Sequence, residues 1–65
     1  MEFEIKDMTC GHCAGVVTKA IKGVDANAQV DIDLTARVVR VLSERAPGDF
    51  VSAVQQAGYS PIERG

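Results

Sequence analysis

Two cysteines separated by two residues, Cys10 and Cys13, have the side-chain type and spacing in this sequence best suited to chemistry. They are the only cysteines among 65 residues, and they lie between a strand-like run at residues 3–6 and a helix-like run at residues 14–22. Thiolate sulfur binds soft metal ions and also carries out disulfide exchange. The sequence therefore predicts either a metal-binding loop or a redox loop.

The helix that follows the loop should favour the thiolate form of both cysteines. Cys10 is expected in the loop and Cys13 in the first helical turn, where unpaired backbone N–H groups and the helix dipole place about half a positive charge. Comparable positions lower the pKa of a cysteine to about 3.5–7.5. Two such thiolates suit Cu(I), which accepts near-linear coordination by two sulfurs and leaves an open side for a third ligand.

Zinc is the next ion to consider, and the residues around the cysteines suit it less well. Zn(II) usually takes four ligands, and the candidates to add are His12, the only histidine, and Asp7, the nearest acid. His12 is adjacent to Cys13 and therefore about 100° around the helix, so closing all three groups on one ion requires strain. We expect His12 to face the solvent, with a weak or transient ligand role, or a contact with a partner, as the alternative.

Met8 and Tyr59 are expected to support the cysteine loop. Met8 has a sulfur atom, but a flexible thioether packs well beneath a loop, and we expect it to point inward and to fix the shape of the loop. Tyr59 either packs at the edge of the sheet or lies beside the loop. In the second case its ring would shield the ion or its hydroxyl would contact the site.

Hydrophobic periodicity predicts six short elements. Alternation of apolar and polar residues indicates strands at residues 3–6, 30–34 and 37–42, and a short last strand is expected at residues 59–63. Helical spacing indicates one helix from about residue 11 to residue 22, ended by Gly23, and another from Pro47, ended by Gly58. The apolar stripes of these helices are Ala14, Val17, Ala20, Ile21 and Val24, and Phe50, Ala53, Val54 and Ala57. Pro61 fits best on an edge strand.

The order of the elements predicts an α+β fold. Strand, helix, strand, strand, helix and strand form an open-faced sandwich, in which two helices cover one face of a four-stranded antiparallel sheet. The third strand then pairs between the first two, and the last strand lies beside the first. Following the strand directions places the Gly58 and Tyr59 segment, and the turn near Thr35, at the same end of the sheet as the cysteine loop.

Length and composition restrict the class of protein. A chain of 65 residues provides one small core, and residues 1–65 are expected to form a single domain. The formal net charge of -2 argues against binding to nucleic acid, and the apolar runs are too short for membrane insertion. The charged first residues lack the apolar core of a signal peptide, so a cytoplasmic protein is expected. A structural disulfide would be unusual there.

Two segments of the sequence resemble those of a known family. Met8-Thr9-Cys10-Gly11-His12-Cys13 resembles the MxCxxC motif of heavy-metal-associated domains, and Ala57-Gly58-Tyr59 resembles the later loop of bacterial, CopZ-like copper chaperones. The resemblance covers essentially the whole chain and implies the ferredoxin-like βαββαβ fold. It implies a carrier of Cu(I), not an enzyme. Cys10 and Cys13 would be its ligands, Met8 and Thr9 would support the loop, and Tyr59 would neighbour the site.

The resemblance also implies partners. Such chaperones pass copper to the metal-binding domain of a copper-transporting P-type ATPase or to a copper-responsive regulator. Because the sequence starts at Met1 and stops after the last predicted strand, we expect a free-standing chaperone, monomeric without metal and able to form metal-bridged dimers. The docking surface is expected at the rim of the loop. Its candidate residues are Thr9, Gly11, His12, Val16 and Tyr59.

Other functions remain as alternatives. Asp7 stands where Gly usually precedes the Met of the motif, and zinc and cadmium carriers recruit nearby carboxylates. A Zn(II) or Cd(II) carrier, or an excised domain of a P-type ATPase, is therefore the alternative within the same class. A thiol–disulfide oxidoreductase is the alternative in a different class, because Cys-Gly-His-Cys also occurs in protein disulfide isomerases. Thioredoxin-like folds need a longer chain and a proline opposite the cysteines, whereas Pro47 and Pro61 are predicted at a helix start and a sheet edge.

Overall fold

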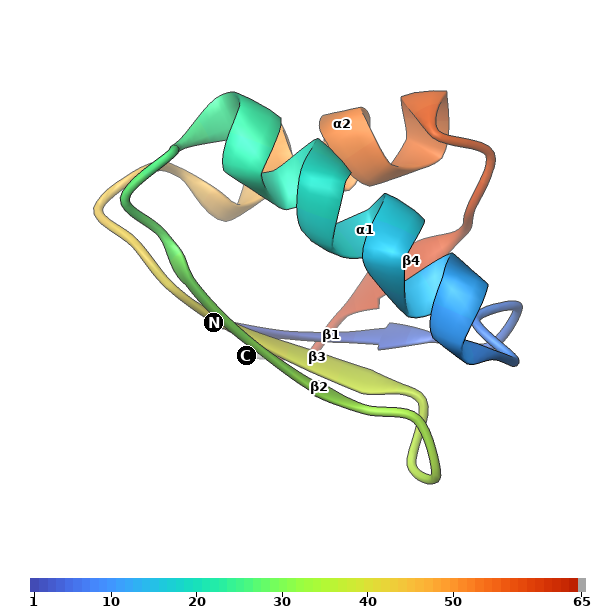
Figure 1. Ribbon diagram of the computed structural model, residues 1–65. Helices are drawn as coiled ribbons and strands as arrows, with labels where there is room; N and C mark the ends of the chain where they lie inside the picture. Colours follow the sequence, from blue (N-terminus) through green and yellow to red (C-terminus); the bar gives the residue numbers. More distant parts are fainter. Residues whose placement is uncertain (65) are drawn as a thin grey trace.

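The computed structural model describes residues 1–64, whose elements follow one another in the predicted order (Figure 1). They are β1 (Glu2–Ile5), α1 (Gly11–Val24), β2 (Gln29–Asp33), β3 (Val38–Leu42), α2 (Pro47–Gln56) and β4 (Pro61–Glu63). The strands pair in the order β2-β3-β1-β4, and every pairing is antiparallel. Both helices lie on one face of the sheet (Figure 1), so the predicted open-faced sandwich is confirmed.

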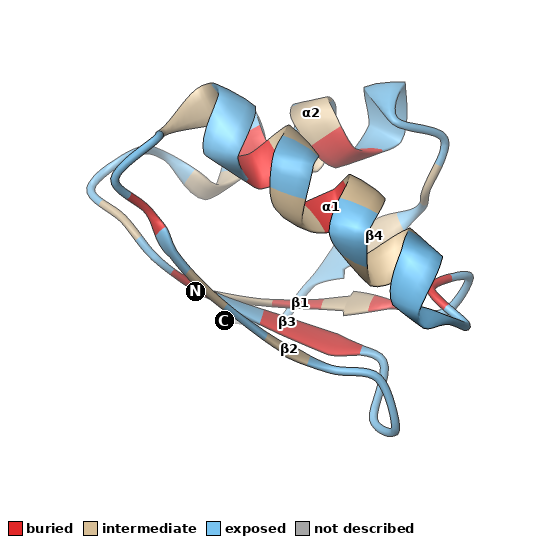
Figure 2. Cartoon of the chain, viewed as in Figure 1, coloured by how far each residue is buried: buried red, intermediate tan, exposed pale blue. Residues whose placement is uncertain are grey.

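The core lies between the two helices and the sheet. Residue alternation in the strands and helical spacing in α1 and α2 direct the apolar side chains of both layers toward one another (Figure 2). The buried side chains are Phe3 and Ile5 from β1, Val38, Val39 and Val41 from β3, Val17 and Ile21 from α1, Phe50 and Val54 from α2, and Met8 and Ala28 from the connecting segments. No polar or charged side chain among residues 1–64 is buried, so the layers are held together by apolar burial.

The turn between β2 and β3 begins earlier than predicted. β2 ends at Asp33 rather than at Leu34, because the Asp33 carboxylate accepts a hydrogen bond of 3.1 Å from the Ala36 backbone N–H and turns the chain. Arg37 also belongs to this turn and has a φ of 57°. β3 therefore begins at Val38.

The first helix extends further than predicted. α1 continues past Gly23 to Val24, which packs against the core. The Asp25 backbone N–H still donates a hydrogen bond of 3.2 Å to the Ile21 carbonyl. Burial of Val24 therefore adds a residue to the helix, although Gly23 is a weak helix former. No helix within residues 1–64 is both long enough and apolar enough to cross a membrane.

The second helix ends near the predicted residue. α2 begins at Pro47 and ends at Gln56, so Ala57 lies beyond the helix and is exposed instead of extending the apolar stripe. Gly58 follows with a φ of 100°, a conformation that favours glycine and ends the helix. β4 begins at Pro61 rather than at Tyr59, and it is an edge strand, so the predicted edge position of Pro61 is confirmed.

Three segments distant in the sequence meet at one end of the sheet. The loop at residues 6–10, the turn at residues 34–37 and the link at residues 57–60 lie at this end (Figure 1). The Arg37 guanidinium donates a hydrogen bond of 3.2 Å to the Lys6 carbonyl, and the Ser60 backbone N–H donates one of 3.3 Å to the Asp7 carboxylate. The predicted convergence of these segments on the cysteine loop is confirmed.

Candidate metal site

The two cysteines lie at the start of α1. Cys10 precedes the helix, has an extended backbone and is exposed, whereas Cys13 lies in the first turn and is half-buried against the core. Both thiols are free, and their sulfur atoms are 3.4 Å apart. The start of the helix thus presents two neighbouring sulfur donors at the end of the sheet where the three segments meet.

Met8 supports the loop from below. Its side chain is 0% exposed and is part of the core, so the prediction that it points inward is confirmed. Its backbone N–H donates a hydrogen bond of 3.1 Å to the Ile5 carbonyl at the end of β1. Met8 therefore anchors the chain just before the exposed residues Thr9 and Cys10.

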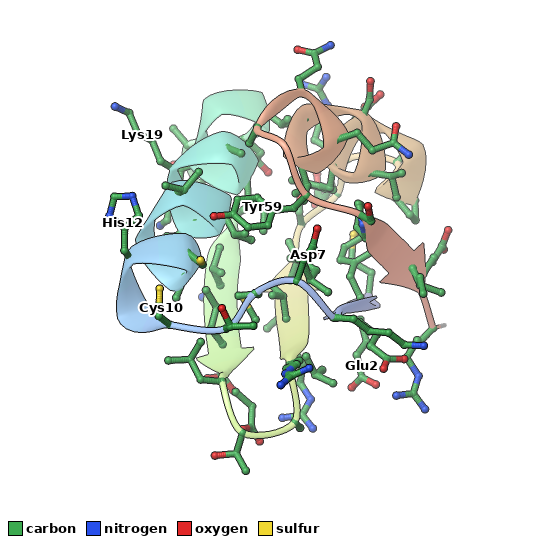
Figure 3. All side chains as sticks on the ribbon, turned by 90° about the vertical axis from the view of Figure 1, so that its right-hand side faces the viewer. Glu2, Asp7, Cys10, His12, Lys19 and Tyr59 are labelled. Atoms are coloured by element: carbon green, nitrogen blue, oxygen red, sulfur yellow. The ribbon has the colours of Figure 1, made fainter. Side chains whose placement is uncertain are left out.

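Tyr59 lies beside Cys13 and alters its acidity. The ring is half-buried against the core, and the hydroxyl is directed toward the start of α1 (Figure 3). Hydrogen bonding from Tyr59 is the largest of the interactions that lower the pKa of Cys13 to about 7, and the Thr9 backbone and the Cys10 thiol add to it. The same hydrogen bond, together with burial, raises the pKa of Tyr59 to about 12. Near neutral pH, Cys13 is therefore partly a thiolate and Tyr59 a neutral donor.

The other two groups considered as ligands are directed elsewhere. The His12 side chain is exposed and points away from Cys10 and Tyr59 (Figure 3), so the prediction that it faces solvent is confirmed, although it belongs to α1. The Asp7 carboxylate accepts the hydrogen bond from Ser60. Among residues 1–64, no three His, Cys, Asp or Glu side chains are grouped so that they could hold one metal ion.

The five residues expected to form the docking surface are all at least partly exposed. Thr9, Gly11 and His12 are exposed, and Val16 and Tyr59 are half-exposed. The hydrogen bond between Asp7 and Ser60 was not predicted. A signal for this hydrogen bond was nevertheless present in the sequence. The predicted topology places the link before the last strand beside the cysteine loop, and that loop contains an acid at residue 7.

The sequence matches the heavy-metal-associated domain model over residues 2–60. It is 36% identical over 62 residues to Copper-transporting ATPase 1 of Rhizobium meliloti (strain 1021) and 31% identical over 58 residues to Superoxide dismutase 1 copper chaperone of Debaryomyces hansenii. The alignments cover 92% and 89% of this chain but only 8% and 23% of those proteins. The chain thus spans a small part of the length of these relatives.

Several solved structures share the fold. A gold binding protein is 45% identical with a TM-score of 0.95, and the alignment covers 98% of each chain. The copper chaperone Atx1 from Synechocystis PCC6803 is 32% identical with a TM-score of 0.92, covering 95% of this chain and 98% of that one. MerP from Ralstonia metallidurans CH34 is 26% identical with a TM-score of 0.79, covering 94% and 89%. The ferredoxin-like fold is therefore that of known copper chaperones, and this chain places a cysteine pair on it.

Proposed function

The chain belongs to the heavy-metal-associated domain family, and from this premise we propose that it is a Cu(I) carrier whose ligands are Cys10 and Cys13. The observation that carries the proposal is the pair of sulfur atoms, 3.4 Å apart, at the start of α1. Two thiolates form a donor set that suits a soft monovalent ion. The pKa of Cys13, lowered to about 7, makes one of these thiolates available near neutral pH.

The surroundings of the cysteines support Cu(I) over Zn(II) or Cd(II). Zn(II) in proteins is almost always bound by three or four side chains, and the candidates to complete such a set are His12 and Asp7. The His12 side chain points away from Cys10, and the Asp7 carboxylate is held by the Ser60 N–H. The site is therefore better suited to an ion that accepts two sulfur ligands.

Copper would leave the site by ligand exchange. An incoming thiolate from a partner's CxxC loop approaches from the exposed side of Cys10 and forms a third Cu–S bond. One of the original Cu–S bonds then breaks, a second bond to the partner forms, and the remaining original bond breaks. The copper stays in the Cu(I) state throughout, and no electron is transferred. Such a carrier is not an enzyme, because its cargo emerges chemically unchanged.

The proposed partners are copper-transporting P-type ATPases, through a metal-binding domain, and copper-responsive regulators. The similarity to a segment of Copper-transporting ATPase 1 supports the first of these, since domains of one family can present matching CxxC loops to each other. We propose with this function that the protein is cytoplasmic. We also propose that it is monomeric without metal and forms a metal-bridged dimer at high protein concentration. The exposed Cys10 would allow one ion to be shared between two copies.

Gold(I) is a second candidate cargo. The 45% identity to a gold binding protein favours it, and gold(I) is a soft monovalent ion that also prefers two thiolates. The same cysteine pair would serve both ions. Competition between Cu(I) and gold(I) for the reduced protein measures which of the two ions the cysteine pair binds more tightly.

The transfer mechanism is tested with a Cys13→Ala variant. Protein loaded anaerobically with Cu(I) is mixed with an isolated CxxC domain of a copper ATPase, and an excess of Cu(I) chelator captures any ion that becomes free. We expect the variant to lose transfer and more than about 100-fold in affinity, beyond what loss of an outer-shell group costs a metal site. Ser52→Ala, at an exposed position in α2, is the control. Normal transfer by Cys13→Ala would contradict the mechanism.

A further inference from the structure

We propose that Asp7 is a positioning residue of the metal site, which holds Tyr59 beside Cys13 through the backbone of Ser60. The inference rests on the proposed function, because it concerns how tightly the same cysteine pair retains its ion. It assigns to Asp7 a role different from that of a metal ligand.

The first observation is a hydrogen bond between segments far apart in the sequence. The Ser60 backbone N–H donates to the Asp7 carboxylate at 3.3 Å, across 53 residues. Asp7 lies in the loop that leads to the cysteines, and Ser60 lies in the link that leads to β4. β1 and β4 are neighbouring strands, paired through Ile5 and Pro61. The hydrogen bond therefore continues their contact beyond the last ladder pair, toward the metal site.

The second observation is that Tyr59 is anchored on its other side as well. Its backbone N–H donates a hydrogen bond of 3.2 Å to the Val54 carbonyl at the end of α2. Gly58, with a φ of 100°, lets the chain reverse just before this point. Tyr59 is thus held by α2 through its own N–H and by Asp7 through the next N–H. Two anchors on adjacent peptide groups leave the tyrosine backbone little freedom to move.

The third observation is the direction of the side chains. In Figure 3 the Asp7 carboxylate rises toward the link before β4, and the Tyr59 hydroxyl extends toward α1. The Asp7 side chain thus reaches the segment that carries Tyr59, the tyrosine that lies beside Cys13. Groups that orient the residues next to a metal ligand commonly control its affinity.

Three single variants separate the possible roles of Asp7. Asp7→Ala removes the acceptor and the charge, whereas Asp7→Asn removes the charge but keeps a carbonyl oxygen that can accept from Ser60. Ser60→Ala is the matched control, because it removes an exposed hydroxyl but keeps the backbone N–H that makes the contact. If the hydrogen bond is what matters, Asp7→Asn and Ser60→Ala should resemble the wild type, and only Asp7→Ala should differ.

The first measurement is amide hydrogen exchange by NMR on the metal-free protein. We expect exchange of the Ser60 N–H to become at least about fivefold faster in Asp7→Ala, as expected when one hydrogen bond is lost. The nuclear Overhauser contacts between the Tyr59 ring and Cys13 should weaken at the same time. Unchanged Ser60 exchange in Asp7→Ala would overturn the proposal, whether or not the protein carries copper.

The second measurement is the rate at which Cu(I)-loaded protein releases its ion to an excess of chelator. We expect release from Asp7→Ala to be faster by roughly tenfold, the lower end of the effect of removing an outer-shell partner. If Asp7 acts through Tyr59, then Asp7→Ala should add little to Tyr59→Phe, because changes that act through one contact are not additive. Full additivity would overturn the proposal, since it would mean an effect independent of Tyr59.

The two measurements keep this proposal distinct from the proposed function. If the wild type does not retain Cu(I), the copper function fails, whereas the exchange experiment still tests the contact between Asp7 and Ser60. If the wild type retains Cu(I) and Asp7→Ala releases it at the wild-type rate, the positioning role fails and the carrier function stands. If Asp7→Asn behaves like Asp7→Ala in both measurements, the charge and not the hydrogen bond is responsible, which also contradicts the proposal.

Discussion

Cys13 and Tyr59 alter each other's acidity through one contact. A hydrogen bond from the tyrosine hydroxyl favours the thiolate over the thiol, which lowers the pKa of Cys13 to about 7. The donor must keep its proton to make this bond, and the pKa of Tyr59 therefore rises to about 12. Copper binding near pH 7 would consequently displace less than one full proton from Cys13, because part of the population is already thiolate.

Removing the tyrosine hydroxyl should raise the pKa of Cys13. Tyr59→Phe keeps the ring that packs against the core and deletes only the donor. We expect the pH profile of Cys13 alkylation, followed by mass spectrometry of the separate cysteines, to move to higher pH. In the wild type the rate should rise up to about pH 7 and then level off.

The presence or absence of this change distinguishes the tyrosine hydroxyl from the helix as the cause of the lowered pKa of Cys13. The wild type and Tyr59→Phe both keep the start of α1, so a helix-dipole effect would remain in the variant. An alkylation profile for Cys13 that is the same in the two proteins would show that the hydroxyl is not responsible. A Ser60→Ala variant, altered at the neighbouring exposed side chain, should give the wild-type profile.

At the scale of the elements, the end of α2 determines where Tyr59 can lie. The Gly58 N–H donates a hydrogen bond of 3.0 Å to the Gln55 carbonyl, and the Tyr59 N–H donates one to the Val54 carbonyl. These two bonds require the chain to turn back across the end of the helix. Gly58 makes the turn with a φ of 100°, a conformation that residues with a Cβ adopt only at a cost.

Gly58→Ala should therefore destabilise the protein by about 1–2 kcal/mol through backbone strain. A Cβ at this residue would meet no atom within 4 Å, so steric contact adds nothing to the effect. Gly15→Ala is the matched control, because a Cβ there also meets no atom within 4 Å, but the residue lies inside α1. Alanine in a helix interior should stabilise by about 1 kcal/mol relative to glycine.

Urea unfolding of both variants measures these effects as changes in the free energy of unfolding. The two substitutions are chemically identical, so opposite signs identify the backbone conformation as the cause. If Gly58→Ala were as stable as the wild type, the positive φ would not constrain this turn. The displacement of Tyr59 should also make Gly58→Ala release Cu(I) faster, whereas Gly15→Ala should release it at the wild-type rate.

For the whole molecule, the topology brings the parts of the site together. One end of the sheet holds the end of β1, the β2–β3 turn and the link before β4 (Figure 1). Residues 8, 13 and 59 therefore lie close together although they are distant in the sequence. Strand alternation and helical spacing were sufficient to predict this arrangement. They act through apolar burial, which depends on residue type and period more than on detailed geometry.

The details that could not be predicted are contacts between polar groups. The Asp33 carboxylate that shortens β2 and the Asp7 carboxylate that holds Ser60 each depend on a side-chain direction that no periodicity encodes. A position of Tyr59 beside the cysteine loop was predicted, but its role as the main cause of the lowered pKa of Cys13 was not. The start of α1 was the expected cause of the lowered pKa of Cys13. The Tyr59 hydroxyl, which lies 46 residues further along the chain, is a second cause.

Cys10 and Cys13 are proposed to form a two-sulfur site for Cu(I). Anaerobic titration of the reduced protein with Cu(I) and, separately, with Zn(II), each against a chelator of known affinity, tests this proposal when it is combined with X-ray absorption on the loaded protein. We predict one tightly bound Cu(I) per chain with two sulfur neighbours and little competition from zinc. Tighter retention of Zn(II), with nitrogen or oxygen neighbours from groups such as His12 or Asp7, would contradict the claim.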